Sequence, residues 1–276
     1  WFDSTSRYQT FMNIILSDFN FLKPSYHHNL IRMGNKNDGG YILPEEIIKN
    51  SDAMLSFGYG YDCSFELDYI YRSNNVVIIY DHTCGYLKLI KNFLKYLKKF
   101  ILLRKRAKDV KLHYDKLINH HNFINSKMIT FFKKKVVRQV KKNIDVGINE
   151  IVQSKNYKNI ILKCDIEGGE YEIMNELTKY NKKISCILVE FHQIDKNIKN
   201  FKDIINNLLN FYTIVHLHGN NHDSLIEGLN IPKTLEITFV KNDFLNTDEY
   251  VTKFPNIFLD NPNNPTIKDL EFEFKN

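Results

Sequence analysis

Short apolar runs separated by helical stretches constrain the fold of this 276-residue chain more than any other feature of its sequence. Each run has five to eight residues and is rich in Ile, Val and Phe, which is typical of strands buried on both faces of a sheet. Strands that alternate with helices predict an α/β fold, with a mostly parallel sheet and helices on both faces. The predicted strands are 53–57, 76–80, 128–132, 159–164, 184–191, 211–217 and 235–240.

The segments between these runs indicate how the strands are connected. The segment 218–233, between the last two runs, is rich in Gly and Asn, so we expect these two strands to form an antiparallel pair. The chain contains no internal repeat and no Gly/Ser/Pro-rich hinge, which predicts one continuous domain. Helical spacing of apolar residues predicts helices over 64–73, 86–115, 167–180 and 197–210.

The composition excludes several classes of protein. Hydrophobic residues make up 43% of the chain and charged residues 25%, so a mainly disordered or collagen-like chain is excluded. No run of about 18 apolar residues occurs, and no transmembrane helix is predicted. The chain shows no signal-peptide pattern, and its four cysteines lack C-x-x-C spacing. We therefore expect a cytoplasmic protein with free thiols.

Positive charge is concentrated in one part of the chain. The net charge of +6 favours anionic small molecules, nucleic acid or acidic membrane surfaces as partners. The most basic segment is 87–111, in which Leu87, Ile90 and Leu94 recur at helical spacing. One interpretation is a basic amphipathic helix that lies on an acidic membrane or polymer. The interpretation we favour is a surface helix whose apolar stripe packs on the sheet while its lysines are solvated.

A Gly-x-Gly sequence follows the first predicted strand. Gly58 and Gly60 would let the backbone approach a cofactor closely, because glycine has no Cβ atom and tolerates positive φ. Asp81 ends the second strand, where a carboxylate suits the hydroxyls of a ribose. The pair fits a dinucleotide or S-adenosylmethionine, and a chance turn is the alternative. The dinucleotide fingerprint expects a third glycine where Cys63 stands, which weakens that interpretation.

A second informative segment, 163–172, has the sequence KCDIEGGEYE. Carboxylates at the start of a helix are favoured by the helix dipole, which explains some of them. It does not explain Asp165, which lies at the carboxyl end of the fourth strand. Ligands of open α/β sheets bind at this edge of the sheet.

With this segment the chain resembles the FkbM-type S-adenosylmethionine-dependent O-methyltransferases. The resemblance implies a seven-strand Rossmann-like methyltransferase sheet in the order 3-2-1-4-5-7-6, with the last strand antiparallel. It also implies one methyltransferase domain over 1–276, with a cap or lid segment (1–50), a core (51–245) and a C-terminal tail (246–276). The motifs that carry it are Arg32–Gly34, Asp38–Tyr41, Ser56–Gly60, Lys163–Glu172, Val189–His192, His216–Asn221, Leu235–Phe239 and Asp260–Pro265.

The resemblance also assigns residues to the cofactor. Three residues at the first strand end would cradle its methionine part, and Asp81 would hold its ribose. Three residues of the N-terminal segment would form part of a lid, for which a plain turn is the alternative. The residues that would cradle the methionine part are Gly58, Gly60 and Asp62, and the lid residues are Asp38, Gly39 and Gly40.

A mixed carboxylate and histidine set is predicted beside the cofactor. Glu190 and His192 lie two residues apart, so they share one side of the fifth strand, and with Asp165 and His218 they form a candidate site for Mn²⁺, Fe²⁺, Co²⁺, Zn²⁺ or Mg²⁺. The alternatives are mutual pairing, or a general base with its orienting residue. We expect His216 to be a satisfied core residue. The predicted catalytic residues are His192 as first candidate base, Glu167 as the second, and Asp165.

The function that follows is transfer of a methyl group from S-adenosylmethionine to a sugar hydroxyl, assisted by a divalent metal. A nucleotide-activated sugar for bacterial capsular polysaccharide is the expected substrate, with no nucleic acid as partner; a homo-oligomer is left open. Two alternatives remain. A nucleic-acid-binding or nucleic-acid-modifying protein would use the basic segments 87–111 and 133–142. An NAD-type oxidoreductase would explain Gly58, Gly60 and Asp81 but not the carboxylate and histidine set.

Overall fold

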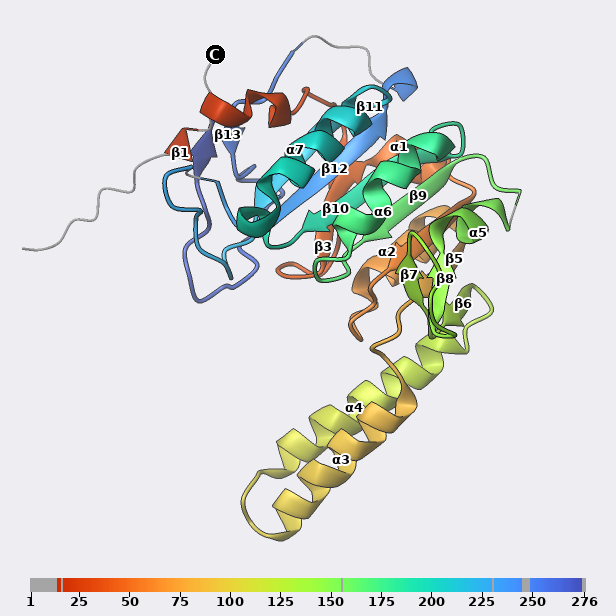
Figure 1. The fold of residues 1–276 in the computed structure, drawn as a ribbon. Helices are drawn as coiled ribbons and strands as arrows, with labels where there is room; N and C mark the ends of the chain where they lie inside the picture. The colour runs from red at the N-terminus through yellow and green to blue at the C-terminus, as the bar shows by residue number, and fades with distance from the viewer. Residues whose placement is uncertain (1–13, 16, 155, 230, 245–248, 275–276) are drawn as a thin grey trace, which may run out of the picture.

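A seven-stranded sheet forms the centre of the computed structural model, which describes residues 14–15, 17–154, 156–229, 231–244 and 249–274 (Figure 1). Its spatial order is β6-β5-β4-β9-β10-β12-β11, and β12 runs antiparallel to both of its neighbours. Numbered along the chain, this order is 3-2-1-4-5-7-6, so the predicted methyltransferase sheet is confirmed. The strands are β4 (Ala53–Phe57), β5 (Val76–Tyr80), β6 (Ile129–Phe132), β9 (Ile160–Cys164), β10 (Ile184–Phe191), β11 (Tyr212–Gly219) and β12 (Leu235–Lys241).

The sheet is buried on both faces, as its apolar runs predict. Along β4, Leu55 faces one core and Met54 the other, because successive residues of a strand point to opposite faces. Helices cover the first face: α5 (Ile148–Gln153), α6 (Glu170–Leu177) and α7 (Ile194–Leu209). The second face is covered by α1 (Glu45–Lys49), α2 (Ser64–Ser73) and the hairpin of β2 (Leu30–Gly34) and β3 (Gly40–Pro44).

Smaller elements complete the described chain. A small sheet joins its two ends, since β1 (Ile14–Ile15) pairs with β14 (Phe272–Glu273), which pairs with β13 (Lys253–Phe254). A two-stranded parallel pair, β7 (Lys135–Val137) and β8 (Asp145–Gly147), follows β6. Three short 3₁₀ helices span Ser17–Leu22, Thr178–Tyr180 and Asn242–Phe244. Among the described helices none is both long and apolar enough to cross a membrane. All four cysteines are free, as predicted.

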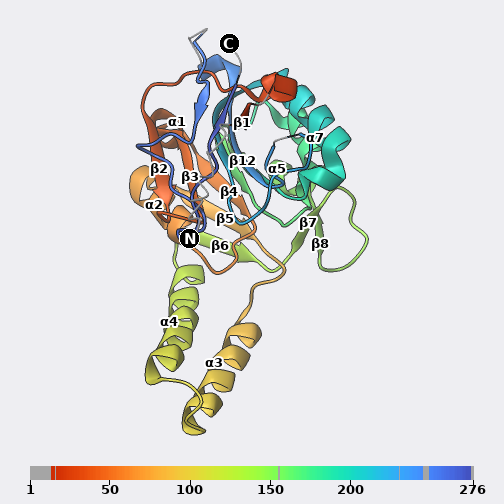
Figure 2. The same ribbon diagram turned by 90° about the vertical axis from the view of Figure 1, so that its left-hand side faces the viewer.

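The basic segment departs from our expectation. The predicted helix over 86–115 is two helices, α3 (Tyr86–Ile101) and α4 (Ala107–Ile124), which form an antiparallel hairpin that projects from the sheet edge (Figures 1 and 2). The chain reverses between them, where Leu103 has a positive φ of 55°. The favoured interpretation, in which the apolar stripe packs on the sheet, is therefore wrong. Of the α3 side chains only Leu89 is buried.

The two histidines of β11 bind the C-terminal segment to the core. His216 is buried with its Nε2 atom 3.1 Å from Asp260, so the expectation of a satisfied core residue is confirmed. His218 lies between two carboxylates, with Nδ1 3.2 Å from Glu236 and Nε2 3.1 Å from Asp269. Burial lowers the pKa of His218, but its hydrogen bonds to these two carboxylates outweigh burial and raise the pKa well above its usual value. The part of the predicted tail that the structure describes, 249–274, is thus anchored by buried ionic hydrogen bonds.

Replacing Asp269 by Asn should lower the free energy of unfolding by about 1.5–3 kcal/mol, the range for a hydrogen bond to a charged group. Because the folded-state pKa of His218 is raised, this deficit should be complete below about pH 6.5 and should shrink as the pH rises through that raised pKa. Urea unfolding at several pH values measures it. The control is Asp243→Asn, which removes an exposed ion pair with Lys241 and should cost less than about 1 kcal/mol. Equal effects of the two substitutions would contradict the anchoring role.

Candidate functional site

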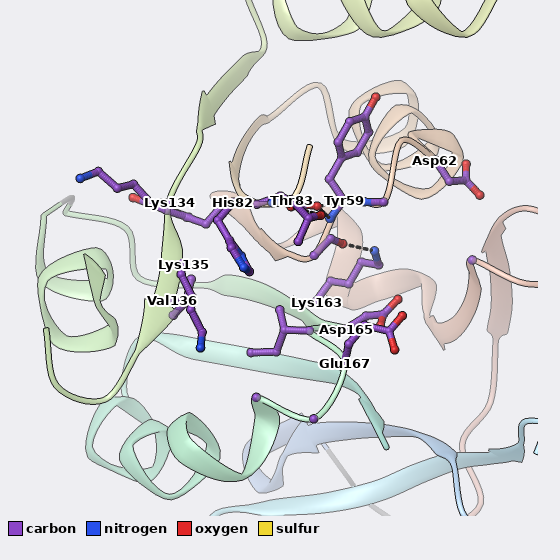
Figure 3. A pocket seen from close by; sticks show the side chains of 18 of the residues that line it. Tyr59, Asp62, His82, Thr83, Lys134, Lys135, Val136, Lys163, Asp165 and Glu167 are labelled. Carbon is purple, nitrogen blue, oxygen red and sulfur yellow. Dashed lines mark hydrogen bonds between the residues drawn. The ribbon is translucent and has the colours of Figure 1, made fainter. Parts of the chain in front are cut away.

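A cavity of about 750 Å³ opens at the carboxyl ends of β4, β5 and β9 (Figure 3). Its volume lies within the usual range for small-molecule and cofactor sites. The sheet places it at a switch point, because the chain proceeds from β4 toward β5 and β6 and then returns to β9 on the other side of β4. The predicted residues that line it are Asp38, Gly39, Gly58, Gly60, Asp62, Asp81, Asp165 and Glu167.

The two glycines after β4 have different roles. A Cβ atom on Gly58 would lie 1.6 Å from the carbonyl oxygen of Asp165, and Gly58 has a φ of +82°. Gly58 is therefore required by the close approach of two backbone segments. Gly60, with a φ of +59°, has no atom within 4 Å of the equivalent position, although it lines the cavity. Only Gly60 leaves open space of the kind a cofactor could enter.

Asp81 fastens the cavity wall. Its Oδ2 accepts hydrogen bonds from the backbone N–H groups of Tyr59, at 2.9 Å, and Gly60, at 3.0 Å. Its Oδ1 accepts bonds from the backbone and hydroxyl of Thr83 and from the backbone of Cys84. Burial raises the pKa of Asp81, but these bonds outweigh burial and lower the pKa to about 2. The carboxylate predicted to hold a ribose is thus already used by five donors of the chain itself, which fill its lone pairs.

The predicted lid residues form the turn between β2 and β3. Gly39, with a φ of +83°, and Asp38 line the cavity, so this turn lies at its edge. Asp62 connects the turn to α2, because its side chain accepts hydrogen bonds from the amide of Asn35 and from the backbone of Ser64. Gly40 is not a lining residue. A Cβ atom there would lie 2.0 Å from the carbonyl oxygen of Asn35, so the tight hairpin turn accounts for this glycine.

A buried lysine forms the floor of the cavity. Lys163 is 4% exposed, donates a hydrogen bond to the carbonyl oxygen of Gly58 at 3.0 Å and lies 3.7 Å from Glu66. Burial opposes its charge, but Glu66 and Asp165 raise the pKa of Lys163. Glu66 in turn accepts a hydrogen bond of 2.6 Å from Ser56. Sequence reasoning missed Glu66, because its position inside α2 carries no local signal of burial.

Four carboxylates surround His192, which directly follows β10. Its Nδ1 atom lies 3.0 Å from Glu170, and its Nε2 atom lies 3.6 Å from Glu167, 3.8 Å from Asp165 and 3.9 Å from Glu190. Single ligand atoms of Asp165, Glu190 and His192 lie within 4.8 Å of one another, so three of the four predicted metal residues come together. His218 is not in this group, since both of its ring nitrogens face other carboxylates.

Negative charge exceeds positive charge in this group. Burial lowers the pKa of His192, but its hydrogen bond to Glu170 and the charge of Glu190 outweigh burial and raise the pKa to about 10. Burial and the neighbouring Asp165 raise the pKa of Glu190 well above its usual value, and burial also raises the pKa of Asp165. Asp165 and Glu190 therefore resist being ionised side by side. Together with the imidazole of His192 they form a donor set that fits a divalent cation.

Glu170 and Tyr41 support this group, and sequence reasoning gave neither a role, although both lie within the motifs of the resemblance. Glu170 is fully buried, and its Oε1 accepts a hydrogen bond from the backbone of Ile166 while contacting His192. It therefore fixes the ring, as second partners of metal-binding histidines do. The hydroxyl of Tyr41, on β3, lies 3.4 Å from Asp165 Oδ2. The GGE sequence before a helix could have indicated a role for Glu170. The position of Tyr41 beside Asp165, in contrast, follows only from the fold.

Basic side chains lie across the cavity from the carboxylates. Figure 3 shows Lys135 on one side and Asp165 with Glu167 on the other. A second hollow, of about 680 Å³, shares Lys135 with the cavity and has further basic residues along its wall. These residues lie in the loop between β7 and β8, and they are Arg138, Lys141 and Lys142.

The comparisons with known proteins bear on the fold. No protein-family model matches the chain, and no curated protein matches it. A solved dimethyladenosine transferase from Plasmodium falciparum is 11% identical with a TM-score of 0.38, covering 72% of this chain and 61% of that one. M. capricolum TrmK, solved with S-adenosylhomocysteine, is 13% identical with a TM-score of 0.36, covering 79% and 72%. A putative S-adenosylmethionine-dependent methyltransferase from Listeria monocytogenes is 10% identical with a TM-score of 0.39, covering 72% and 94%.

At these identities and TM-scores we assign the fold from the strand order of the chain itself and take no activity from the neighbours. The chain spans 61% of the length of the Plasmodium protein. The FkbM-type resemblance rests on the motifs of the sequence, without a matching family model.

The two glycines allow a matched test of the cavity. Gly60→Ala should weaken binding of S-adenosylhomocysteine at least tenfold, because its methyl group enters the open side of the cavity, and should cost about 1–2 kcal/mol of stability for the left-handed backbone. Gly58→Ala should cost more stability, because its methyl group meets the backbone of Asp165. Calorimetric titration and thermal unfolding measure the two effects. Wild-type affinity in Gly60→Ala would show that no cofactor occupies that side of the cavity.

Proposed function

We propose that this chain is an S-adenosylmethionine-dependent O-methyltransferase that methylates a sugar hydroxyl with the help of a divalent metal. One observation carries the proposal: the cavity at the switch point of the sheet includes Asp165, which also belongs to the group with Glu190 and His192. A cavity that could hold the cofactor and a group that could hold a cation therefore share one wall. The FkbM-type motifs contain the residues of this group and several residues of this cavity, and the resemblance supports the same methyltransferase activity.

The cofactor would enter the cavity between Gly60 and Lys163. The start of helix α2 favours S-adenosylmethionine over a dinucleotide as the cofactor. Helix α2 begins at Ser64 with Cys63 before it, so the third glycine that a pyrophosphate requires at this helix start is replaced by a residue with a side chain. A sulfonium cofactor has no pyrophosphate and makes no such demand. Asp81 would act by holding the loop of Tyr59 and Gly60 in place, and the ribose would require other partners.

Asp165, Glu190 and His192 would hold the metal, with Glu170 orienting the His192 ring. A bound divalent cation lowers the pKa of a coordinated hydroxyl and neutralises the excess carboxylate charge. The surroundings change our preferred general base. With Nδ1 bonded to Glu170 and Nε2 facing Asp165 and Glu190, His192 would have no nitrogen left to accept a proton once it holds the metal. Asp165 lines the cavity, and the carboxylate oxygen that does not bind the metal would accept the hydroxyl proton.

The acceptor would be anionic. Lys134 and Lys135 line the cavity, and the neighbouring hollow adds Arg138, Lys141 and Lys142, so a negatively charged group next to the acceptor hydroxyl would meet several cations. The diphosphate of a nucleotide-activated sugar fits this distribution of basic side chains. The protein would then act in the cytoplasm, in the synthesis of a bacterial capsular polysaccharide. The N-terminal cap, including Asp38 and Gly39, would close over the cofactor.

Cofactor binding tests the proposal directly. Calorimetric titration should show saturable binding of S-adenosylhomocysteine and no binding of NAD⁺. Transfer of labelled methyl groups from S-adenosylmethionine to a panel of nucleoside diphosphate sugars then tests the acceptor class. Binding of NAD⁺ without S-adenosylhomocysteine would instead support an oxidoreductase, and methylation of RNA but of no sugar would support the nucleic-acid alternative.

Metal binding gives an independent prediction. Wild-type protein should bind Mn²⁺, and His192→Ala should weaken that affinity at least tenfold, because one of the three donors is lost. The matched control is His222→Ala, which removes an exposed histidine and should leave the affinity unchanged. Electron paramagnetic resonance of free Mn²⁺ measures the affinity without any turnover. Equal affinities in the two variants would refute the metal site and leave a metal-free carboxylate base.

A further inference from the structure

The α3–α4 hairpin has a larger net positive charge than the entire chain. Between residues 86 and 124 the chain has nine lysines and two arginines against two aspartates, a net charge of +9, whereas the entire chain carries +6. The remainder of the chain is therefore net negative. The hairpin belongs to none of the motifs that carry the methyltransferase resemblance, and its helices project away from the sheet (Figure 2).

The hairpin also exposes a face of large apolar side chains. In α3, Tyr86, Leu89, Phe93 and Tyr96 recur at helical spacing, and rings of this row contact α4. The Phe93 ring, for example, lies 5.9 Å from the Tyr114 ring in a tilted arrangement. A second apolar row follows about 100° further around α3, and it is not covered by α4. Its exposed members are Leu87 (70%), Ile90 (39%), Leu94 (54%) and Ile101 (70%).

Helix α4 extends this face. Tyr114, which contacts Phe93, is still 49% exposed, and Ile118 is 37% exposed. Leu112 of α4 is exposed as well, at 53%. The reversal between the helices adds Leu102 and Leu103, the latter 92% exposed, followed directly by the basic sequence 104–106.

The base of the hairpin is fixed to the cavity wall. Tyr59, which lines the cavity, stacks on Phe123 at 5.3 Å and on His120 at 5.7 Å, both near the end of α4. The hydroxyl of Tyr61 donates a hydrogen bond to the carbonyl oxygen of Gly85, just before α3, and accepts one from its N–H. A partner bound to the hairpin would therefore hold the cavity in a defined orientation.

We propose that the α3–α4 hairpin docks this protein on the surface of a bilayer that contains anionic lipid. The exposed apolar rows enter the boundary between headgroups and acyl chains, while the lysines and arginines bind the lipid phosphates. This division into an apolar face and a strongly basic face is that of interfacial helices. At 16 and 18 residues, α3 and α4 lie in the interface and do not cross the bilayer.

Charge and apolarity together favour a bilayer over other occupants. A second copy of the hairpin would bring two segments of +9 together, and like charges at that density repel. RNA would satisfy the lysines but would leave Leu87, Ile101 and Leu103 in water. An anionic membrane surface is complementary to both sets of side chains.

Vesicle sedimentation with the full chain tests this. The protein should sediment with mixed phosphatidylcholine–phosphatidylglycerol vesicles and not with phosphatidylcholine alone. Leu102→Ser/Leu103→Ser should reduce the partition coefficient at least tenfold, and Lys91→Glu/Lys98→Glu should do the same. The exposed positions of these residues allow folding to be retained, which circular dichroism and thermal unfolding check.

Two matched variants serve as controls. Ile257→Ser/Phe258→Ser removes apolar side chains that are 81% and 87% exposed elsewhere, and Lys182→Glu/Lys199→Glu reverses two exposed charges. Both should bind the vesicles as the wild type does. Failure of the wild type to sediment with anionic vesicles would overturn the proposal, as would equal losses in the hairpin and control variants. Binding of RNA, or a dimer dissolved by Leu102→Ser/Leu103→Ser, in the absence of vesicle binding would also overturn it.

Discussion

The carboxylate of Asp81 is the interaction on which the cavity depends. It ends β5 and binds the backbone of Tyr59 and Gly60, which follow β4, together with the turn at Thr83 and Cys84. Two strand ends and the start of the α3–α4 hairpin are thereby held by one buried charge. Without Asp81 these N–H groups would need other partners, and a buried donor left unpaired costs about 1–3 kcal/mol. The pKa of Asp81, lowered to about 2, shows how strongly this loop favours the ionised carboxylate.

The opposite wall is organised by an excess of carboxylates. Asp165, Glu170 and Glu190 come from the ends of neighbouring strands and from the start of α6, and His192 supplies one positive partner for all of them. Lys163 compensates part of the charge from below. An arrangement of this kind is unstable as a purely structural feature, because buried like charges raise one another's pKa. Its stability would rise if a cation were bound, which is the physical basis for proposing a metal there.

Charge is also separated on a larger scale. The hairpin carries a net +9, and the body of the protein is net negative. The same chain therefore presents a basic, partly apolar projection and a cavity with carboxylates on one wall and lysines on the other. The aromatic contacts of Tyr59 with His120 and Phe123 join these two regions. An acceptor molecule near a membrane surface would thus meet a cavity whose orientation is set by the hairpin.

The sequence by itself determined the seven strands, their alternation with helices and the positions of Gly58, Asp81 and Asp165 at strand ends. These features depend on local spacing and on burial, which neighbouring residues in the chain already reveal. The FkbM-type motifs additionally implied the correct strand order. The tertiary structure decided which side chains are already paired. His218 faces Asp269, which lies 51 residues further along the chain, and so does not join the metal group.

The same reason explains the other differences from expectation. Asp81 was expected to hold a ribose, but its five donors become visible only when the loops after β4 and β5 are brought together. The stripe of Leu87, Ile90 and Leu94 predicted a helix correctly but not the surface it faces, because amphipathicity specifies an apolar side and not its partner. Local spacing therefore determined the elements of this protein. Contacts between residues distant in sequence decided which of its charges are compensated and which apolar face remains exposed.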